Sequence, residues 1–178
     1  MKAILAILTV LGIDLSSKEW AEKNLPLNKK REIVKDHLYF WHIKNRGIAY
    51  NRFSGRRKGI LLATGALLAF YGGLLVRILR GKGERRLALP LALTLGGGAA
   101  NFWERLRKGR VTDFLFIPVK GKNAPIFNIA DVSIVVGALW MTVIPFLKIR
   151  KMILLLPNMG DCSIISTEIL KCTTTCYI

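Results

Sequence analysis

Residues 60–79 read ILLATGALLAFYGGLLVRIL, twenty residues in which Arg77 is the only charge. A helix that crosses a bilayer needs about 20 predominantly apolar residues. Three further apolar runs, residues 3–13, 87–103 and 132–147, contain no charge at all. We therefore predict an α-helical polytopic membrane protein with four transmembrane helices. The spans are expected at about residues 3–18, 60–79, 87–103 and 130–149.

The first apolar run has two interpretations. Lys2 followed by eleven apolar residues is also typical of a secretory signal peptide. No small-x-small cleavage site follows, however, because the next residues are Asp14-Leu-Ser-Ser-Lys18. We favour an uncleaved first span that continues through Asp14 and Lys18.

The composition narrows the class of protein. Hydrophobic residues make up 52% of the 178 residues, beside 22% charged residues and a net charge of +17. Long apolar runs between basic loops are typical of a small polytopic membrane protein, and the apolar content excludes a disordered chain. A nucleic-acid partner is not expected, because a soluble nucleic-acid binder keeps its basic residues free of such runs.

The cysteines and histidines do not suggest a metal site. All three cysteines lie within the last 17 residues, and the two histidines, His37 and His42, have no second ligand nearby in the sequence. Neither pattern has the spacing of a zinc site. We expect no metal and no organic cofactor.

The polar segment of residues 19–59 contains a strand pattern. Six residues, the first three aromatic or branched, lie there at every second position: Tyr39, Trp41, Ile43, Asn45, Gly47 and Ala49. The opposite face carries Phe40, His42, Lys44 and Arg46. This period predicts a β-strand with one apolar face. We expect a small extramembrane β-cradle at about residues 30–55, between helices 1 and 2 and lying on the membrane surface.

Three carboxylates lie at the edges of apolar runs: Asp14, Asp113 and Asp131. An ionisable group at membrane depth is costly and is by default a functional candidate. Structural roles are equally open. Lys18 follows Asp14 at the favourable helical spacing of four residues. Asp131 lies where the fourth helix is expected to begin, and the helix dipole stabilises an acid there.

Two carboxylates held together share a proton, so that one can act as a base and the other as an acid. Asp113 and Asp131 are the candidates, 18 residues apart, and the intervening Pro118, Gly121 and Pro125 allow the chain to double back.

Other polar residues accompany this pair. Asn101 and Arg105 share a helix face, as do Asn128 and Asp131. Glycines 96–98 allow helices to approach closely, which is the main role we expect for them.

Five motifs resemble, in this order, those of lipoprotein signal peptidase (signal peptidase II, prolipoprotein signal peptidase), a family of bacterial membrane aspartic peptidases. They are Asp14-Leu-Ser-Ser-Lys18, Asn45-Arg-Gly-Ile-Ala49, Gly97-Gly-Ala-Ala-Asn101 with Arg105, Gly109-Arg-Val-Thr-Asp-Phe114 and Phe127-Asn-Ile-Ala-Asp131. The resemblance covers about residues 1–150. One departure is Glu104, where the family usually has Asp before the arginine.

The resemblance implies an aspartic endopeptidase that removes the signal peptide from diacylglyceryl-modified bacterial prolipoproteins by cleaving before the lipidated lipobox cysteine. It implies Asp113 and Asp131 as the catalytic residues. It implies substrate-binding or supporting roles for Asn101, Arg105, Asn128, Asn45, Gly47, Asp14 and Lys18. Residues 1–151 would form one membrane peptidase domain, followed by a tail, residues 152–178, of unknown role.

The expected partners are lipid-modified prolipoproteins and membrane lipids, and the expected state is a monomer. The expected location is the bacterial inner membrane, multi-pass, with the active site near the outer face. The charge count favours the opposite orientation, because the two loops on the proposed outer side, residues 18–58 and 105–122, hold 18 of the 28 Lys and Arg.

Two alternatives belong to other classes of protein. A membrane transporter would also place carboxylates at membrane depth, but it would more often show an inverted repeat, which we do not find. A non-catalytic membrane scaffold would tolerate the loss of either aspartate.

Overall fold

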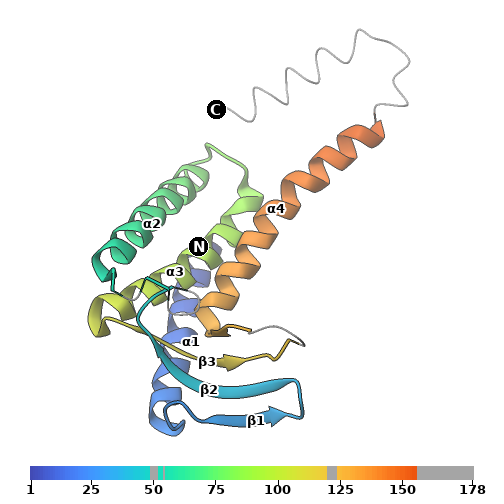
Figure 1. Ribbon diagram of the computed structural model, residues 1–178. Helices are drawn as coiled ribbons and strands as arrows, with labels where there is room; N and C mark the ends of the chain where they lie inside the picture. The colour runs from blue at the N-terminus through green and yellow to red at the C-terminus, as the bar shows by residue number, and fades with distance from the viewer. Residues whose placement is uncertain (49–51, 54, 120–123, 156–178) are drawn as a thin grey trace.

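Four long helices and a small sheet make up the described part of the chain, residues 1–48, 52–53, 55–119 and 124–155 of the computed structural model. Figure 1 shows the sheet at one end of the helices. The helices are α1 (Lys2–Asn24), α2 (Arg57–Leu79), α3 (Ala88–Lys108) and α4 (Ile129–Leu155), with a 3-10 turn, η2 (Arg85–Leu87). The strands are β1 (Lys30–Val34), β2 (Leu38–Asn45), β3 (Val111–Phe116) and β4 (Ile126–Phe127).

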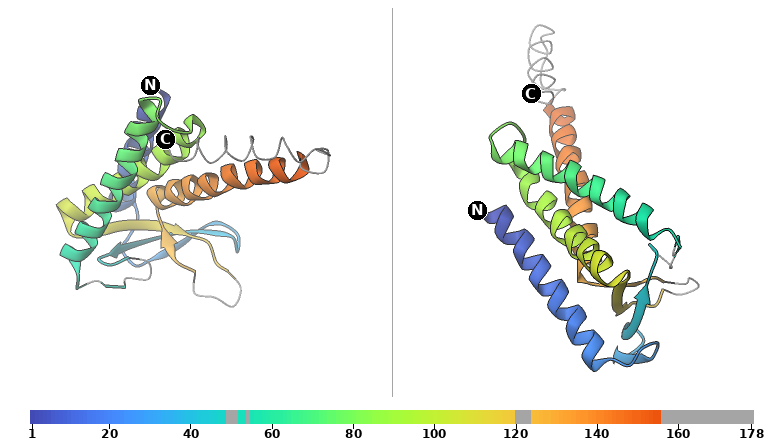
Figure 2. Two further views of the ribbon diagram at one scale, coloured as in Figure 1. Left: turned by 90° about the horizontal axis from the view of Figure 1, so that it is seen from above. Right: turned by 90° about the vertical axis from the view of Figure 1, so that its left-hand side faces the viewer.

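Helix α3 is the centre of the helical layer, because it packs against each of the other three helices. Figure 2 shows α1 running beside it. Three consecutive glycines, 96–98, make this possible. A Cβ at these positions would meet Val10 of α1, Ser133 of α4 and Leu68 of α2 in turn. Consecutive helical residues point about 100° apart, so each glycine admits a different helix.

Within the described residues, two helical segments are long and apolar enough to cross a membrane: Arg57–Leu79 and Ile129–Leu147. Their outer faces carry large exposed apolar side chains, for example Leu62 (77% exposed) and Phe70 (61% exposed). Continuous apolar surface of this kind is typical of a membrane contact. Helices α1 and α3 occupy the expected positions of the other two spans but carry buried polar residues. Of the four predicted membrane crossings, two therefore have the required length and composition, those of α2 and α4.

The sheet is antiparallel in the order β1-β2-β3-β4. The cradle predicted at about residues 30–55 supplies β1 and β2, and the sheet extends beyond that range. Strand β2 ends at Asn45, and two of the four strands come from the segment between α3 and α4. Strands β3 and β4 form a hairpin, so the chain does double back between Asp113 and Asp131. Gly121, one of the three residues expected to permit this reversal, lies outside the described residues.

The expected single apolar face of β2 is not found. The register between β2 and β3 shifts between Phe40 and Ile43. As a result His42 and Asn45 are both buried, although strict alternation places them on opposite faces. A bulge inserts an extra residue and re-aims the side chains that follow it. Here it directs Asn45 toward β3.

A small apolar core joins the end of α1 to the sheet. It consists of Ala21, Leu25 and Phe114, all buried, with Phe40 packed against it. The Phe40 ring also contacts Trp20, with 5.2 Å between centroids. This core holds β3, and with it the residue before Phe114, at a fixed position relative to α1.

The predicted boundary after residue 151 falls inside a helix, since α4 continues to Leu155. The remaining residues of the predicted tail, 156–178, lie outside the described residues.

Candidate active site

A cavity of about 490 Å³ lies where α3, α4 and the sheet meet. Its polar lining comes from four elements or their ends: Asn45, Asn101, Arg105, Asp113 and Asp131. Its apolar lining includes Ile48 and Val111 from the sheet side and Val132, Val135 and Val136 from α4. Both aspartates that the sequence singled out therefore face one space.

Asp113 reaches the cavity because β3 pairs with β2, with Ile43 opposite Asp113. The residue is 2% exposed. Its Oδ1 accepts a hydrogen bond from Asn128 Nδ2 at 2.7 Å, and its Oδ2 accepts one from Asn45 Nδ2 at 3.1 Å. Burial, with a smaller contribution from the nearby Asp131 carboxylate, raises the pKa of Asp113 from 3.8 to about 7. Asp113 therefore exchanges a proton near neutral pH.

Asp131 lies in the first turn of α4 and forms a reciprocal cap with Asn128, the residue before the helix. The Asp131 backbone N–H donates to Asn128 Oδ1 at 2.9 Å, and the Asn128 backbone N–H donates to Asp131 Oδ2 at 3.3 Å. This is a capping box, which satisfies two backbone donors that a helix start leaves open. The structural role that we kept open for Asp131 and its position in the site thus coexist.

Two asparagines present their amide N–H groups to the two aspartates. Asn128 Oδ1 accepts from the helix backbone, so its Nδ2 is directed at Asp113. Asn101 Oδ1 accepts from Lys18 Nζ at 2.7 Å, so its Nδ2 is directed at Asp131 Oδ1, at 2.8 Å. The Oδ1 of each asparagine accepts from a group that can only donate. The amide therefore cannot flip, and its Nδ2 is fixed on the opposite side.

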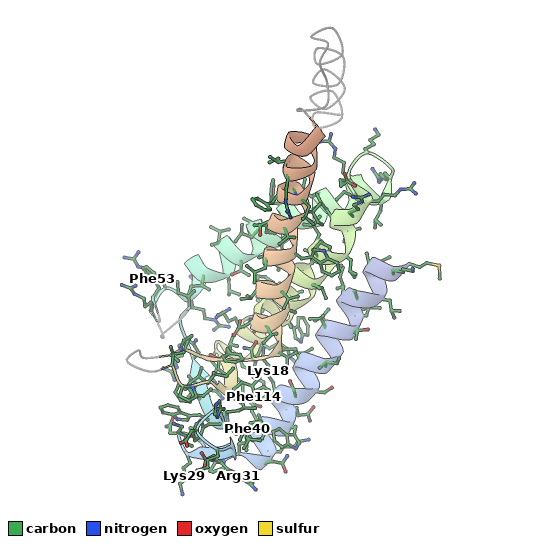
Figure 3. All side chains as sticks on the ribbon, turned by 90° about the vertical axis from the view of Figure 1, so that its right-hand side faces the viewer. Lys18, Lys29, Arg31, Phe40, Phe53 and Phe114 are labelled. Atoms are coloured by element: carbon green, nitrogen blue, oxygen red, sulfur yellow. The ribbon has the colours of Figure 1, made fainter. Side chains whose placement is uncertain are left out.

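Lys18 is the cation that orders this arrangement. Its side chain is 2% exposed, and its Nζ lies 2.7 Å from Asp14, 2.7 Å from Asn101 and 3.3 Å from Glu104. An ammonium group has three hydrogens, so three oxygens match its capacity. Asp14 also accepts from the backbone N–H of Ala130, at 2.7 Å. Figure 3 shows Lys18 where α1 passes the start of α4, near the sheet. Lys18 therefore connects α1 to α3, and Asp14 connects α1 to α4.

Glu104 supports the strand that carries Asp113. Its side chain is buried and accepts from the backbone N–H of Thr112 at 3.1 Å and from the Thr112 hydroxyl at 2.8 Å. Glu22 of α1 is a second acceptor within 2.9 Å of the same hydroxyl. Sequence reasoning missed both Thr112 and Glu22. The spacing of Glu22, which follows Asp14 and Lys18 at intervals of four on one face of α1, is the signal that would have found it.

The loop after β2 is tied to α3 beside the cavity. Asn45 Oδ1 accepts from the Gly47 backbone N–H at 3.0 Å, and the Gly47 carbonyl accepts from Arg105 Nη2 at 2.8 Å. Arg105 Nε is buried without a hydrogen-bond partner among the described residues. The guanidinium thus keeps donor capacity at the cavity. Ala49, the last residue of this motif, lies outside the described residues.

All nine predicted site residues belong to this one network of contacts. The histidines lie elsewhere: His37 is exposed, and buried His42 contacts the Leu25 carbonyl through Nδ1. In the part of the chain that the structure describes, no three His, Cys, Asp or Glu side chains are grouped to hold a metal ion.

Comparison with known proteins gives consistent matches. The model of the family described as signal peptidase (SPase) II matches residues 6–147. A lipoprotein signal peptidase of Listeria welshimeri is 31% identical over 149 residues, which cover 83% of this chain and 94% of that protein. One from Bacillus subtilis is 33% identical over 133 residues, covering 74% and 84%.

A solved structure is also similar. It is described as a bacterial membrane enzyme determined by the in meso method at 2.3 Å resolution. It superposes with a TM-score of 0.72 at 26% identity, covering 83% of this chain and 88% of that one.

Proposed function

The chain belongs to the signal peptidase II family, whose members remove the signal peptide from prolipoproteins, and we propose that Asp113 and Asp131 are its catalytic pair. One observation carries the proposal. The two carboxylates line a single cavity, and each accepts a hydrogen bond from an asparagine of fixed orientation. The enzyme is then an aspartic endopeptidase, which hydrolyses a peptide bond without a covalent intermediate.

In the first step, a water molecule between the carboxylates attacks the scissile carbonyl carbon. Asp131 takes a proton from that water, while protonated Asp113 gives its proton to the carbonyl oxygen. The raised pKa of Asp113 suits this role, because a general acid works best when its pKa lies near the working pH. The product is a neutral tetrahedral intermediate.

In the second step, the bond between carbon and nitrogen breaks. Asp131 passes its proton to the departing amine, and Asp113 recovers a proton from the intermediate's hydroxyl. The released signal peptide ends in a carboxyl group, and the pair returns to its starting state. This exchange of acid and base roles is what two carboxylates in unequal environments allow.

The substrate is a prolipoprotein whose lipobox cysteine carries diacylglycerol, and the cut falls before that cysteine. Arg105 and the asparagines hold the peptide in register, which contributes through positioning. The cavity continues as an apolar surface along α4 through Val132 and Val135, and Val135 is 55% exposed. An acyl chain that lies in the bilayer can follow this surface to the aspartates.

We further propose that all four helices cross the bacterial inner membrane, as one peptidase domain of residues 1–151. The long apolar α2 and α4 support this arrangement. The polar groups of α1 and α3 face inward and bind one another, so they need not meet lipid. The sheet and the site then lie near the outer face, and the protein acts as a monomer.

The test is cleavage of two forms of one prolipoprotein by the purified protein in detergent, with and without diacylglycerol on the lipobox cysteine. We expect a gel shift for the modified form alone, and sequencing should find the modified cysteine at the new amino terminus. Equal cleavage of both forms, or a cut at another bond, would contradict the proposed substrate. No cleavage by folded protein would contradict the peptidase activity itself.

A further inference from the structure

Arg57, the first residue of α2, contacts the end of a different helix. Its Nη2 donates to the carbonyl of Arg105 at 3.2 Å and to that of Leu106 at 3.0 Å. Both carbonyls belong to the last turn of α3, whose C-cap residue is Gly109, with φ of 72°. The last four carbonyls of a helix have no partner within the helix, and a cation complements the negative end of its dipole. The Arg105 carbonyl also accepts from the Gly109 backbone N–H at 3.0 Å, so Arg57 adds a side-chain cap to the backbone cap of α3.

The capped turn carries a residue of the site. The backbone of Arg105 accepts from Arg57, while the side chain of Arg105 donates to the Gly47 carbonyl at 2.8 Å. Gly47 follows β2 at the start of the connection that leads to Arg57 itself. Arg105 thus contacts this connection near both of its ends: its side chain binds Gly47, and its backbone carbonyl accepts from Arg57.

The start of this connection, next to Gly47, forms part of the cavity wall. Ile48, next to Gly47, lines the cavity. Its carbonyl accepts from Asn45 Nδ2 at 3.3 Å, the amide that also donates to Asp113. A change in the position of Arg105 is therefore expected to move both Ile48, which lines the cavity, and Asn45, which binds Asp113.

From these contacts we propose that Arg57 is a positioning residue of the peptidase: it fixes the last turn of α3, so that Arg105 holds Gly47 and Ile48 in place for the substrate. Arg57 is not among the residues that line the cavity. The inference rests on the proposed function, because it assigns a role in substrate binding. Its effect should appear in KM, since a displaced wall weakens binding of the peptide without changing the aspartates.

The first test compares three variants with the parent in the cleavage assay. Arg57→Ala should raise KM about three- to tenfold and leave kcat within about twofold. Arg57→Lys should restore part of the loss, because an ammonium can also donate to the two carbonyls. Arg56→Ala is the matched control. It removes the cation of the neighbouring residue. The Arg56 guanidinium lies 5.8 Å from the exposed ring of Phe53. Figure 3 shows Phe53 far from Lys18.

The second test separates positioning from simple stabilisation of α3. Binding of lipidated prolipoprotein is measured in Asp113→Asn protein, which need not turn over. We expect Arg57→Ala to weaken binding when Arg105 is intact and to add nothing in an Arg105→Ala background, since coupled residues are not additive. An equal effect in both backgrounds would overturn the proposal. If the parent protein cleaves, equal KM values for Arg57→Ala and Arg56→Ala would also overturn the proposal. Failure of the parent to cleave would instead count against the proposed function.

Discussion

Replacing Asp113 by asparagine is expected to change how the stability of the protein depends on pH. The folded protein binds the Asp113 proton more tightly than the unfolded chain does, because its pKa is raised from 3.8 to about 7. The stabilisation from this proton is therefore complete below pH 4 and is lost as the pH rises through 7. An asparagine side chain has no such proton to lose, so the Asp113→Asn variant lacks this dependence.

The size of the effect follows from the pKa. A change from 3.8 to about 7 corresponds to about 4 kcal/mol in the free energy of unfolding. About 2–3 kcal/mol of this falls between pH 5 and pH 8, where a membrane protein is easily handled. The amide at position 113 offers one acceptor to two asparagine donors, which costs about 1–3 kcal/mol, but this cost does not vary with pH.

The assay is denaturant unfolding in detergent at several pH values, with the parent and Asp113→Asn side by side. The difference in unfolding free energy between them should shift in favour of the variant as the pH rises. Asp36→Asn is the control for loss of one carboxylate, because Asp36 is exposed in the turn after β1. Parallel curves for the parent and Asp113→Asn would refute the reasoning, and so would the same shift in the control.

Three further changes test the support of the site. Lys18→Met should lower the unfolding free energy by about 3–5 kcal/mol, because it leaves buried carboxylates unpaired, whereas Lys23→Met, at an exposed ion pair, should leave the melting temperature nearly unchanged. Gly97→Ala should cost about 1–3 kcal/mol by forcing α3 from α4, while Gly72→Ala, which meets open space, should be neutral or slightly stabilising in the same thermal assay. Glu104→Gln should reduce the cleavage rate more than Glu104→Asp, which keeps the charge beside the buried ammonium; the reverse order would contradict this role.

The helices could be predicted from local sequence patterns, and the residues of the candidate site were proposed largely from motifs that resemble those of a known family. Apolar runs gave the first residue of each helix to within three residues, but α1, α3 and α4 extend five or six residues beyond the predicted ends. Helical spacing predicted that Asn101 lies beside Arg105 and Asn128 beside Asp131, although Asn128 precedes α4 and caps it. The motif order supplied the rest of the site residues.

The shape of the sheet could not be predicted in the same way, because it depends on pairing between distant segments. Nothing in the period of β2 indicates that β3 will join it, or that a bulge will turn Asn45 toward Asp113. The role of Thr112 was hidden for the same reason: its partners, Glu104 and Glu22, lie on two different helices.

The most direct test of the catalytic pair is the cleavage rate of lipid-modified prolipoprotein by the parent, Asp113→Asn and Asp131→Asn. Unfolding curves should first show that each protein is folded. We predict that the parent cleaves and that each variant loses at least about a hundredfold in rate, since each lacks one member of the proposed acid–base pair. A folded variant that cleaves at the parent's rate would contradict the assignment of that aspartate and the mechanism built on the pair.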